Sequence, residues 1–174
     1  IRVSVEYVSG ISWQEREHLF DLGEIQILWL CGLPYVDKVD AAEHDVELLA
    51  VPVPSGERYQ SKPIYFSVVV VRCDRPFRFF QDLRGASWAY NEPHSHSGFN
   101  VVRAHLAQSG EPGHFFRAAI ESGSHSASLE MVVSGRADSS AIDSTVLEWL
   151  AAQRRNLVNS IRVIGTFFSL TNSI

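Results

Sequence analysis

The run at residues 64–71, Ile-Tyr-Phe-Ser-Val-Val-Val-Val, most constrains how this 174-residue chain can fold. A β-branched and aromatic run of this length is typical of a strand that a sheet buries on both faces. After it, segments with helical spacing alternate with short apolar segments. We expect helices near 77–83, 98–108, 128–133 and 144–156, and strands near 86–90, 118–122, 138–142 and 161–167. This alternation predicts βαβ units and an open, mostly parallel α/β sheet.

The segment before residue 64 also predicts α/β structure. Ser12 followed by Glu15 is a capping-box signature, and it predicts a helix over 12–22. Gly32 and Pro34 predict a turn after the second of three expected strands. These strands are expected at 1–8, 24–30 and 46–53.

Composition excludes several classes of function. The chain has 15 basic and 20 acidic residues, a net charge of −5, and no basic run that could neutralise a phosphate backbone, so we expect no nucleic-acid partner. Its apolar runs fall far short of the roughly 20 residues that span a bilayer. Cys31 and Cys73 match no zinc spacing, and whether they pair stays open.

Three expected strand-to-helix turns are unusually polar: Ser-His-Ser at 95–97, Ser-His-Ser at 124–126 and Asp-Ser-Thr at 143–145. In an open α/β sheet, turns of this kind meet at the carboxyl ends of the strands, where ligands bind. A helix start offers unpaired N–H groups and a partial positive charge, so it can hold an oxyanion, and Gly98 allows close approach. Asp143 is instead an acceptor, suited to a ligand that carries a proton on its oxygen or an ammonium group.

Other interpretations use the same residues. Ser, Thr and Asp are ordinary helix caps, and most caps bind nothing. A hydrolase would use Ser97 as nucleophile, His125 as base and Asp143 as orienter, but the G-x-S-x-G elbow is lacking. A zinc site from His94, His96 and His125 would lack a spaced carboxylate or cysteine.

Longer stretches of the sequence resemble a known family. They are YFSVVVVRCD, DLRGASWAYNEPHSHSGFNVVRAHL, ESGSH and GRADSSAIDS, within residues 35–166. In this order they resemble the substrate-binding proteins of phosphonate, phosphite and phosphate ABC transporters. The upstream GEIQILWLCGLPYV looks like the strand and turn before that family's first ligand-contacting loop.

The resemblance implies a type 2 periplasmic-binding-protein fold, in which two α/β lobes with mostly parallel sheets are joined by two crossing strands. We expect a partial first lobe at 1–66, the second lobe at 67–162 and a return crossing strand at 163–174. The family's first strand and helix, its signal peptide and its closing first-lobe segment are not matched. We therefore expect the chain to be truncated at both ends.

The resemblance also implies a function and a set of ligand contacts. We expect a non-enzymatic receptor, periplasmic or extracellular, that captures a phosphonate- or phosphate-type oxyanion and delivers it to a membrane permease. It would be a monomer without a cofactor; the alternative is a sensory domain with the same fold. The implied ligand contacts are Ser95, His96, Ser97, His125, Asp143, Tyr65 and Tyr35.

Overall fold

The computed structural model describes residues 3–41, 46–111 and 113–169. The chain divides into two compact units, Ile1–Leu30 and Cys31–Ile174. The first unit contains helix α1 (Trp13–Asp21), and the second contains all the strands. As predicted, the Ser12 hydroxyl caps α1 by accepting the N–H of Glu15 at 3.1 Å.

The three strands predicted before residue 64 are wrong for the described residues. Residues 3–9, 24–30 and 46–55 form no sheet ladder, and residues 1–2 lie outside the described part. The apolar side chains of these segments stay largely exposed, with Val5 at 86% and Ile27 at 73%. Strand-like spacing is not sufficient here, because a strand also needs a hydrogen-bonding partner and an apolar surface to cover.

The turn predicted at Gly32 and Pro34 is also wrong. Helix α2 runs from Gly32 to Ala41 and includes both residues. Pro34 lies in the first turn of the helix, where backbone N–H groups have no intrahelical acceptor, so its missing N–H costs nothing. Proline therefore helps to start this helix instead of ending the preceding segment.

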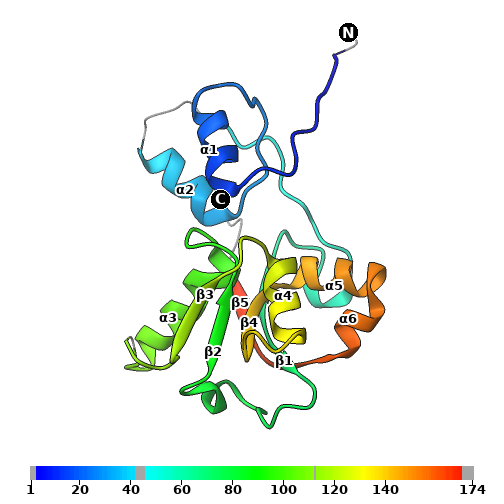
Figure 1. Ribbon diagram of the computed structural model, residues 1–174. Coiled ribbons are helices and arrows are strands. Elements are labelled where there is room, and N and C mark those ends of the chain that lie inside the picture. The colour runs from blue at the N-terminus through cyan, green and yellow to red at the C-terminus, as the bar shows by residue number, and fades with distance from the viewer. Residues whose placement is uncertain (1–2, 42–45, 112, 170–174) are drawn as a thin grey trace. The chain divides into compact units, whose positions relative to one another are not determined.

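The second unit is built on a five-stranded sheet with the order β3-β2-β4-β1-β5 (Figure 1). β2 pairs in parallel with both β3 and β4, whereas β1 is antiparallel to β4 and β5. Four strands thus run in one direction, which confirms the mostly parallel α/β sheet. The strands are β1 (Tyr65–Arg72), β2 (Ser87–Tyr90), β3 (Ala118–Glu121), β4 (Ser139–Asp143) and β5 (Ile161–Ser169).

Helices follow the strands in the predicted order. β2 leads into a π-helical turn and then α3, β3 into α4, and β4 into α5. The helix predicted over 144–156 is interrupted at Arg154, whose backbone leaves the helical region (φ −134°, ψ 61°). Besides α1 and α2, the helical elements of the described residues are the 3-10 helices Glu57–Tyr59 and Phe80–Leu83, the π-helical turn His96–Asn100, α3 (Val101–Gln108), α4 (His125–Val133), α5 (Ser144–Gln153) and α6 (Arg155–Asn159).

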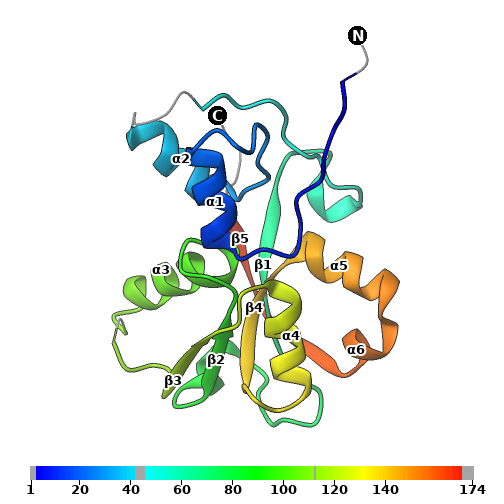
Figure 2. The same ribbon diagram turned by 45° about the horizontal axis from the view of Figure 1, so that its top comes forward.

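The sheet is covered on both faces, as the valine run predicts. Residues 68–71 are at most 2% exposed, and successive side chains point to opposite faces. Val69 and Val71 pack with Val102 and Leu106 of α3 on one face. Val68 and Val70 pack with residues of α4 and α5 on the other, and Figure 2 shows the helices divided in this way. Burying each such side chain contributes roughly 1.5–3 kcal/mol.

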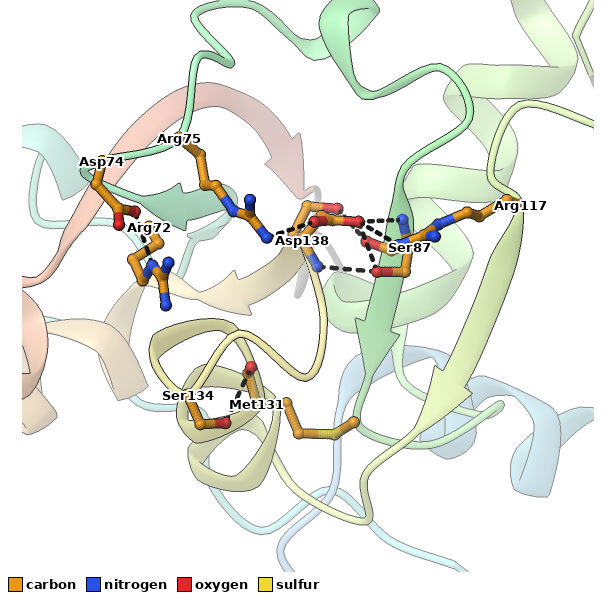
Figure 3. Close-up of polar contacts among 9 residues, drawn as sticks. Arg72, Asp74, Arg75, Ser87, Arg117, Met131, Ser134 and Asp138 are labelled. Carbon is orange, nitrogen blue, oxygen red and sulfur yellow. Dashed lines mark hydrogen bonds and ion pairs between the residues drawn. The ribbon is translucent and has the colours of Figure 1, made fainter.

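A polar cluster around Asp138 closes the amino ends of β2 and β4 (Figure 3). One carboxylate oxygen accepts the Ser87 N–H at 2.9 Å, the Ser87 hydroxyl at 2.8 Å and the Arg117 guanidinium at 3.0 Å. The other accepts from Arg75 at 3.4 Å. Burial opposes ionisation, but the Ser87 and Arg117 donors outweigh it and hold the pKa of Asp138 below its usual range.

Cys31 and Cys73 are both free thiols, so they do not form a disulfide with each other. In the described part of the chain, no helix is both long and apolar enough to cross a bilayer.

Candidate functional site

The three polar turns lie where predicted, at the carboxyl ends of β2, β3 and β4, and each caps a helix. The ordinary capping interpretation is therefore correct for three of their side chains. Ser95 Oγ, Ser124 Oγ and Asp143 Oδ1 accept the backbone N–H groups of Gly98, Ala127 and Thr145 at 3.1, 3.1 and 2.7 Å.

Thr145 and Glu148, three residues apart at the start of α5, have the spacing of a capping box but do not form one. The Thr145 hydroxyl donates to Asp143 Oδ1 at 2.7 Å, so Asp143 is the cap. Glu148 instead accepts the hydroxyl of the buried Tyr59 at 2.8 Å. That hydroxyl also lies 3.1 Å from Ser144 Oγ, which ties the 3-10 helix Glu57–Tyr59 to the start of α5.

Two of the turns converge through Ser97 and His125. Ser97 Oγ lies 3.3 Å from His125 Nε2, within hydrogen-bonding reach, and Ser97 is fully buried. The Ser97 carbonyl accepts the Ser67 hydroxyl at 2.6 Å. Ser67 pairs with Asp143 across β1 and β4. The start of α4 and the π-helical turn therefore meet over the end of β4.

Gly98 has a steric role at this convergence. A Cβ atom at this position would lie 1.8 Å from Asn91 Oδ1 and 2.9 Å from His125 Cε1. Asn91 is only 6% exposed, and its Oδ1 accepts no hydrogen bond from the described residues. Because residue 98 has no side chain, the buried Asn91 Oδ1 atom and the His125 ring can both pack against the turn.

His125 is a neutral group at pH 7. Burial lowers its pKa to about 4, although the Asp143 carboxylate and the Ala141 carbonyl act in the opposite direction. Its Nδ1 atom is buried and has no hydrogen-bond partner of normal geometry in the described part. A neutral imidazole carries one N–H, so His125 offers one donor and one acceptor to this site.

Cys31 lies at the same site. Burial raises the pKa of its thiol to about 11; the His96 backbone N–H opposes the rise, and the carboxylates of Asp143 and Glu92 add to it. The Tyr65 hydroxyl also acts on the thiol and lowers its pKa. The start of α2 therefore approaches the turn at 95–97. Burial also lowers the pKa of the half-buried His96.

The hydrolase arrangement is incomplete in this geometry. Ser97 and His125 are close enough for a nucleophile and a base, but in the described part of the chain Asp143 and His125 form no hydrogen bond with each other. Asp143 Oδ1 is instead occupied by the N–H and hydroxyl of Thr145. The zinc arrangement finds no support either, since no group of three or more potential metal ligands gathers in the described ranges.

The seven predicted ligand residues are not all brought together. The convergence of Ser97 and His125 also includes Ser95 and Asp143. The His96 backbone and the Tyr65 hydroxyl both interact with the Cys31 thiol, which lies at the same site. Tyr35 lies on α2, and its N–H donates to the Cys31 carbonyl at 3.3 Å. Within the described ranges, no hydrogen bond, ion pair or ring contact links the Tyr35 side chain to this site. All seven assignments as ligand residues stay predictions.

Comparison with known proteins decides the family. A family model described as the periplasmic substrate-binding protein of phosphonate ABC transporters matches residues 1–173. The chain belongs to this family. No curated protein sequence matches the chain significantly.

Solved structures show the same fold at low sequence identity. PhnD1 from Prochlorococcus marinus, in complex with methylphosphonate, has 17% identity and a TM-score of 0.73 over 94% of this chain and 60% of its own. A binding protein component of a phosphonate ABC transporter from Pseudomonas aeruginosa has 18% identity and a TM-score of 0.56, covering 62% of this chain and 37% of its own. The periplasmic aliphatic sulphonate binding protein SsuA from Escherichia coli has 19% identity and a TM-score of 0.55, covering 88% and 47%.

These neighbours establish a type 2 periplasmic-binding-protein fold for a partial chain. The chain spans between 37% and 60% of the length of the three proteins. The lobe boundaries at residues 66 and 162 therefore stay a prediction.

Sequence reasoning missed three residues of the site, Ser67, Asn91 and Cys31. Ser67 interrupts an otherwise apolar strand, and a buried polar residue in such a run is a usable signal. Asn91 directly follows β2, at the strand end where ligands bind in this class of sheet. Cys31 carries no comparable signal, because its approach to the turn depends on how α2 packs.

Proposed function

We propose that this chain captures a phosphonate- or phosphate-type oxyanion and leaves it chemically unchanged. The observation that carries this proposal is the convergence of Ser97 and His125, 3.3 Å apart, beside Gly98 and at the starts of helices that follow two strands. In the proposed complex, Ser95, Ser97 and His125 donate to the oxyanion, and Asp143 accepts from the ligand. His96, Tyr65 and Tyr35 complete the contacts.

The proposed binding needs no cationic side chain. Helix starts carry a partial positive charge, and hydrogen bonds to an ionised acceptor contribute roughly 1.5–3 kcal/mol each. Three or four such bonds would contribute roughly 4.5–12 kcal/mol before the cost of association is subtracted. The P. marinus neighbour, solved with methylphosphonate, supports this choice of ligand class.

Family membership supports the wider role. We expect the ligand to be enclosed between two lobes in the periplasm and the closed form, as a monomer, to deliver it to a membrane permease. The sensory alternative has no observation in its favour, and the incomplete Ser97, His125 and Asp143 arrangement argues against the hydrolase.

The test is a thermal-shift series on the full chain with methylphosphonate, phosphite, phosphate and sulfate, followed by calorimetric titration. A ligand at about 100 times its dissociation constant stabilises the protein by about 2.7 kcal/mol, which is readily measured. Ser97→Ala and His125→Ala should each weaken binding at least about tenfold, equal to one lost hydrogen bond of about 1.4 kcal/mol.

Ser109→Ala and His114→Ala are the matched controls, because both residues are exposed and distant in sequence from the turn. Both controls should bind like the wild type. Equal affinity in all five proteins would show that the site is elsewhere. A chain that folds but responds to no phosphorus oxyanion would refute the proposed function.

A further inference from the structure

Two carboxylates, from Asp143 and Glu92, act on residues at the convergence of Ser97 and His125. Asp143 lies at the end of β4, beside His125, and the carboxylates of Asp143 and Glu92 are the main charged groups acting on the Cys31 thiol. The Arg58 guanidinium reaches α5 but pairs with Glu148 at 3.5 Å. Glu92 enters from the loop after β2 and Asp143 from β4, so the negative charge comes from two elements.

Neither His125 nor His96 offsets this charge near neutral pH. His125 faces Ser97 from α4, and burial keeps its ring neutral, with a pKa of about 4. His96 lies on the π-helical turn, and burial lowers its pKa as well. Cys31, just before α2, is neutral in this range, because burial raises the pKa of its thiol to about 11. Backbone N–H groups at the starts of α4 and α5 add partial positive charge.

Burial is the main reason that the Cys31 thiol resists ionisation, and the carboxylates of Asp143 and Glu92 add to this effect. The thiol lies against the His96 N–H, one of the groups available to an oxyanion, yet ionisation of the thiol is strongly disfavoured there. A second negative charge on a bound oxyanion would meet the same burial and the same two carboxylates.

Unsatisfied acceptors also point to a ligand that donates. Asn91 is only 6% exposed, and its Oδ1 atom is buried against Gly98 without a hydrogen-bond donor among the described residues. Asp143 uses Oδ1 for Thr145, which leaves its other carboxylate oxygen as an acceptor beside His125. A fully ionised phosphonate has no hydrogen to give to these oxygens, whereas its singly protonated form has one.

We propose that this site selects phosphorus oxyanions with a single negative charge and a remaining donor hydrogen, which Asp143 accepts, and discriminates against the dianion. This inference rests on the proposed function and specifies the protonation state of its ligand. The affinity for a phosphonate should then fall once the ligand loses its second proton.

The experiment is calorimetric titration of the full chain with methylphosphonate from pH 5.5 to 9, with the second ionisation of the ligand measured separately in the same buffers. At pH values above the second pKa of methylphosphonate, the affinity should fall about tenfold per pH unit, in proportion to the fraction of the ligand that is still a monoanion. Methanesulfonate, a monoanion with no proton to lose, should bind more weakly and with little pH dependence. Sulfate, a dianion throughout, should bind poorly at every pH.

Asp143→Asn is the decisive variant, because asparagine also caps helices well and should keep α5 in place. Because the variant lacks the charged acceptor, it should bind methylphosphonate about tenfold more weakly than the wild type at pH 6. At pH 9 it should bind equally well or better, since one repulsive charge is gone. Melting curves of both proteins check that the fold is unchanged.

A wild-type affinity for methylphosphonate that stays constant or rises between pH 6 and 9 would overturn this inference while leaving the proposed function intact. A parallel fall for methanesulfonate would also overturn it, since the titrating group would then belong to the protein. No binding of any oxyanion at any pH would refute the proposed function, and this inference with it.

Discussion

Replacing Gly98 by alanine tests the geometry of the site most directly. The added Cβ would lie 1.8 Å from Asn91 Oδ1, whereas real Cβ contacts under 3.0 Å are essentially never found. It would also lie 2.9 Å from His125 Cε1. The Asn91 amide and the imidazole would both have to move, and both are packed inside the protein.

Overpacking of this kind costs about 1–3 kcal/mol. In a protein of this size, each kcal/mol lowers the melting temperature by about 2–4 °C, so Gly98→Ala should melt about 2–12 °C lower. Binding should suffer more than stability, because the displaced turn carries Ser97 and the displaced ring is its partner. We expect at least a tenfold loss of methylphosphonate affinity, about 1.4 kcal/mol.

Two controls isolate the cause. Gly113→Ala adds the same methyl group where no atom lies within 4 Å, and it should change neither melting nor affinity. Adding Asn91→Ala to Gly98→Ala removes the closer clash. The double variant should therefore lose less free energy of unfolding than the two single variants together, by about 0.5–3 kcal/mol. If Gly98→Ala melts and binds like the wild type, the close packing described here is not present in solution.

Three further predictions concern other parts of the second unit. Asp138→Asn should lower the free energy of unfolding by about 1–3 kcal/mol at pH 7. Because the folded pKa of Asp138 is depressed, this difference should fade as the pH falls through that value, and equal urea midpoint shifts at pH 7 and pH 3 would contradict it. Tyr59→Phe should cost about 1–2 kcal/mol in the same assay, since it removes the hydrogen bond to Glu148, and an unchanged midpoint would count against that bond. A thiol-specific reagent at pH 8 should label the exposed Cys73 much faster than Cys31, whose burial raises its pKa to about 11; equal rates would be inconsistent with this burial.

The part of the fold that was predictable is the part determined by local pattern. The four valines at 68–71 specify a strand covered on both faces whatever its partners are, and the caps at Ser95, Ser124 and Asp143 specify where helices begin. The strands expected at 24–30 and 46–53 failed because a strand exists only with a neighbour, and strand-like spacing cannot show whether the neighbour is present.

The candidate site was predictable to a similar extent. Ser97 and His125 were expected to meet because parallel strands bring their following turns to one edge, and the structure places them 3.3 Å apart. The approach of Cys31 and the packing of Asn91 against Gly98 depend on how elements distant in sequence fit together. No local pattern carries that information.

β4 has an aspartate at each end, and the two carboxylates have different roles. Asp138 directly precedes the strand and closes its amino end, whereas Asp143 ends it at the candidate site. At about 3.3 Å per residue, the Cα atoms of the two residues are roughly 16 Å apart along the strand, beyond the range over which mutational effects usually couple. Substitutions around Asp138 should therefore change thermal stability without changing ligand affinity, and substitutions around Asp143 should change affinity with little effect on the Asp138 cluster. A sensor for the proposed ligand could be stabilised by changes at the amino end of the sheet while its affinity is set at the carboxyl end.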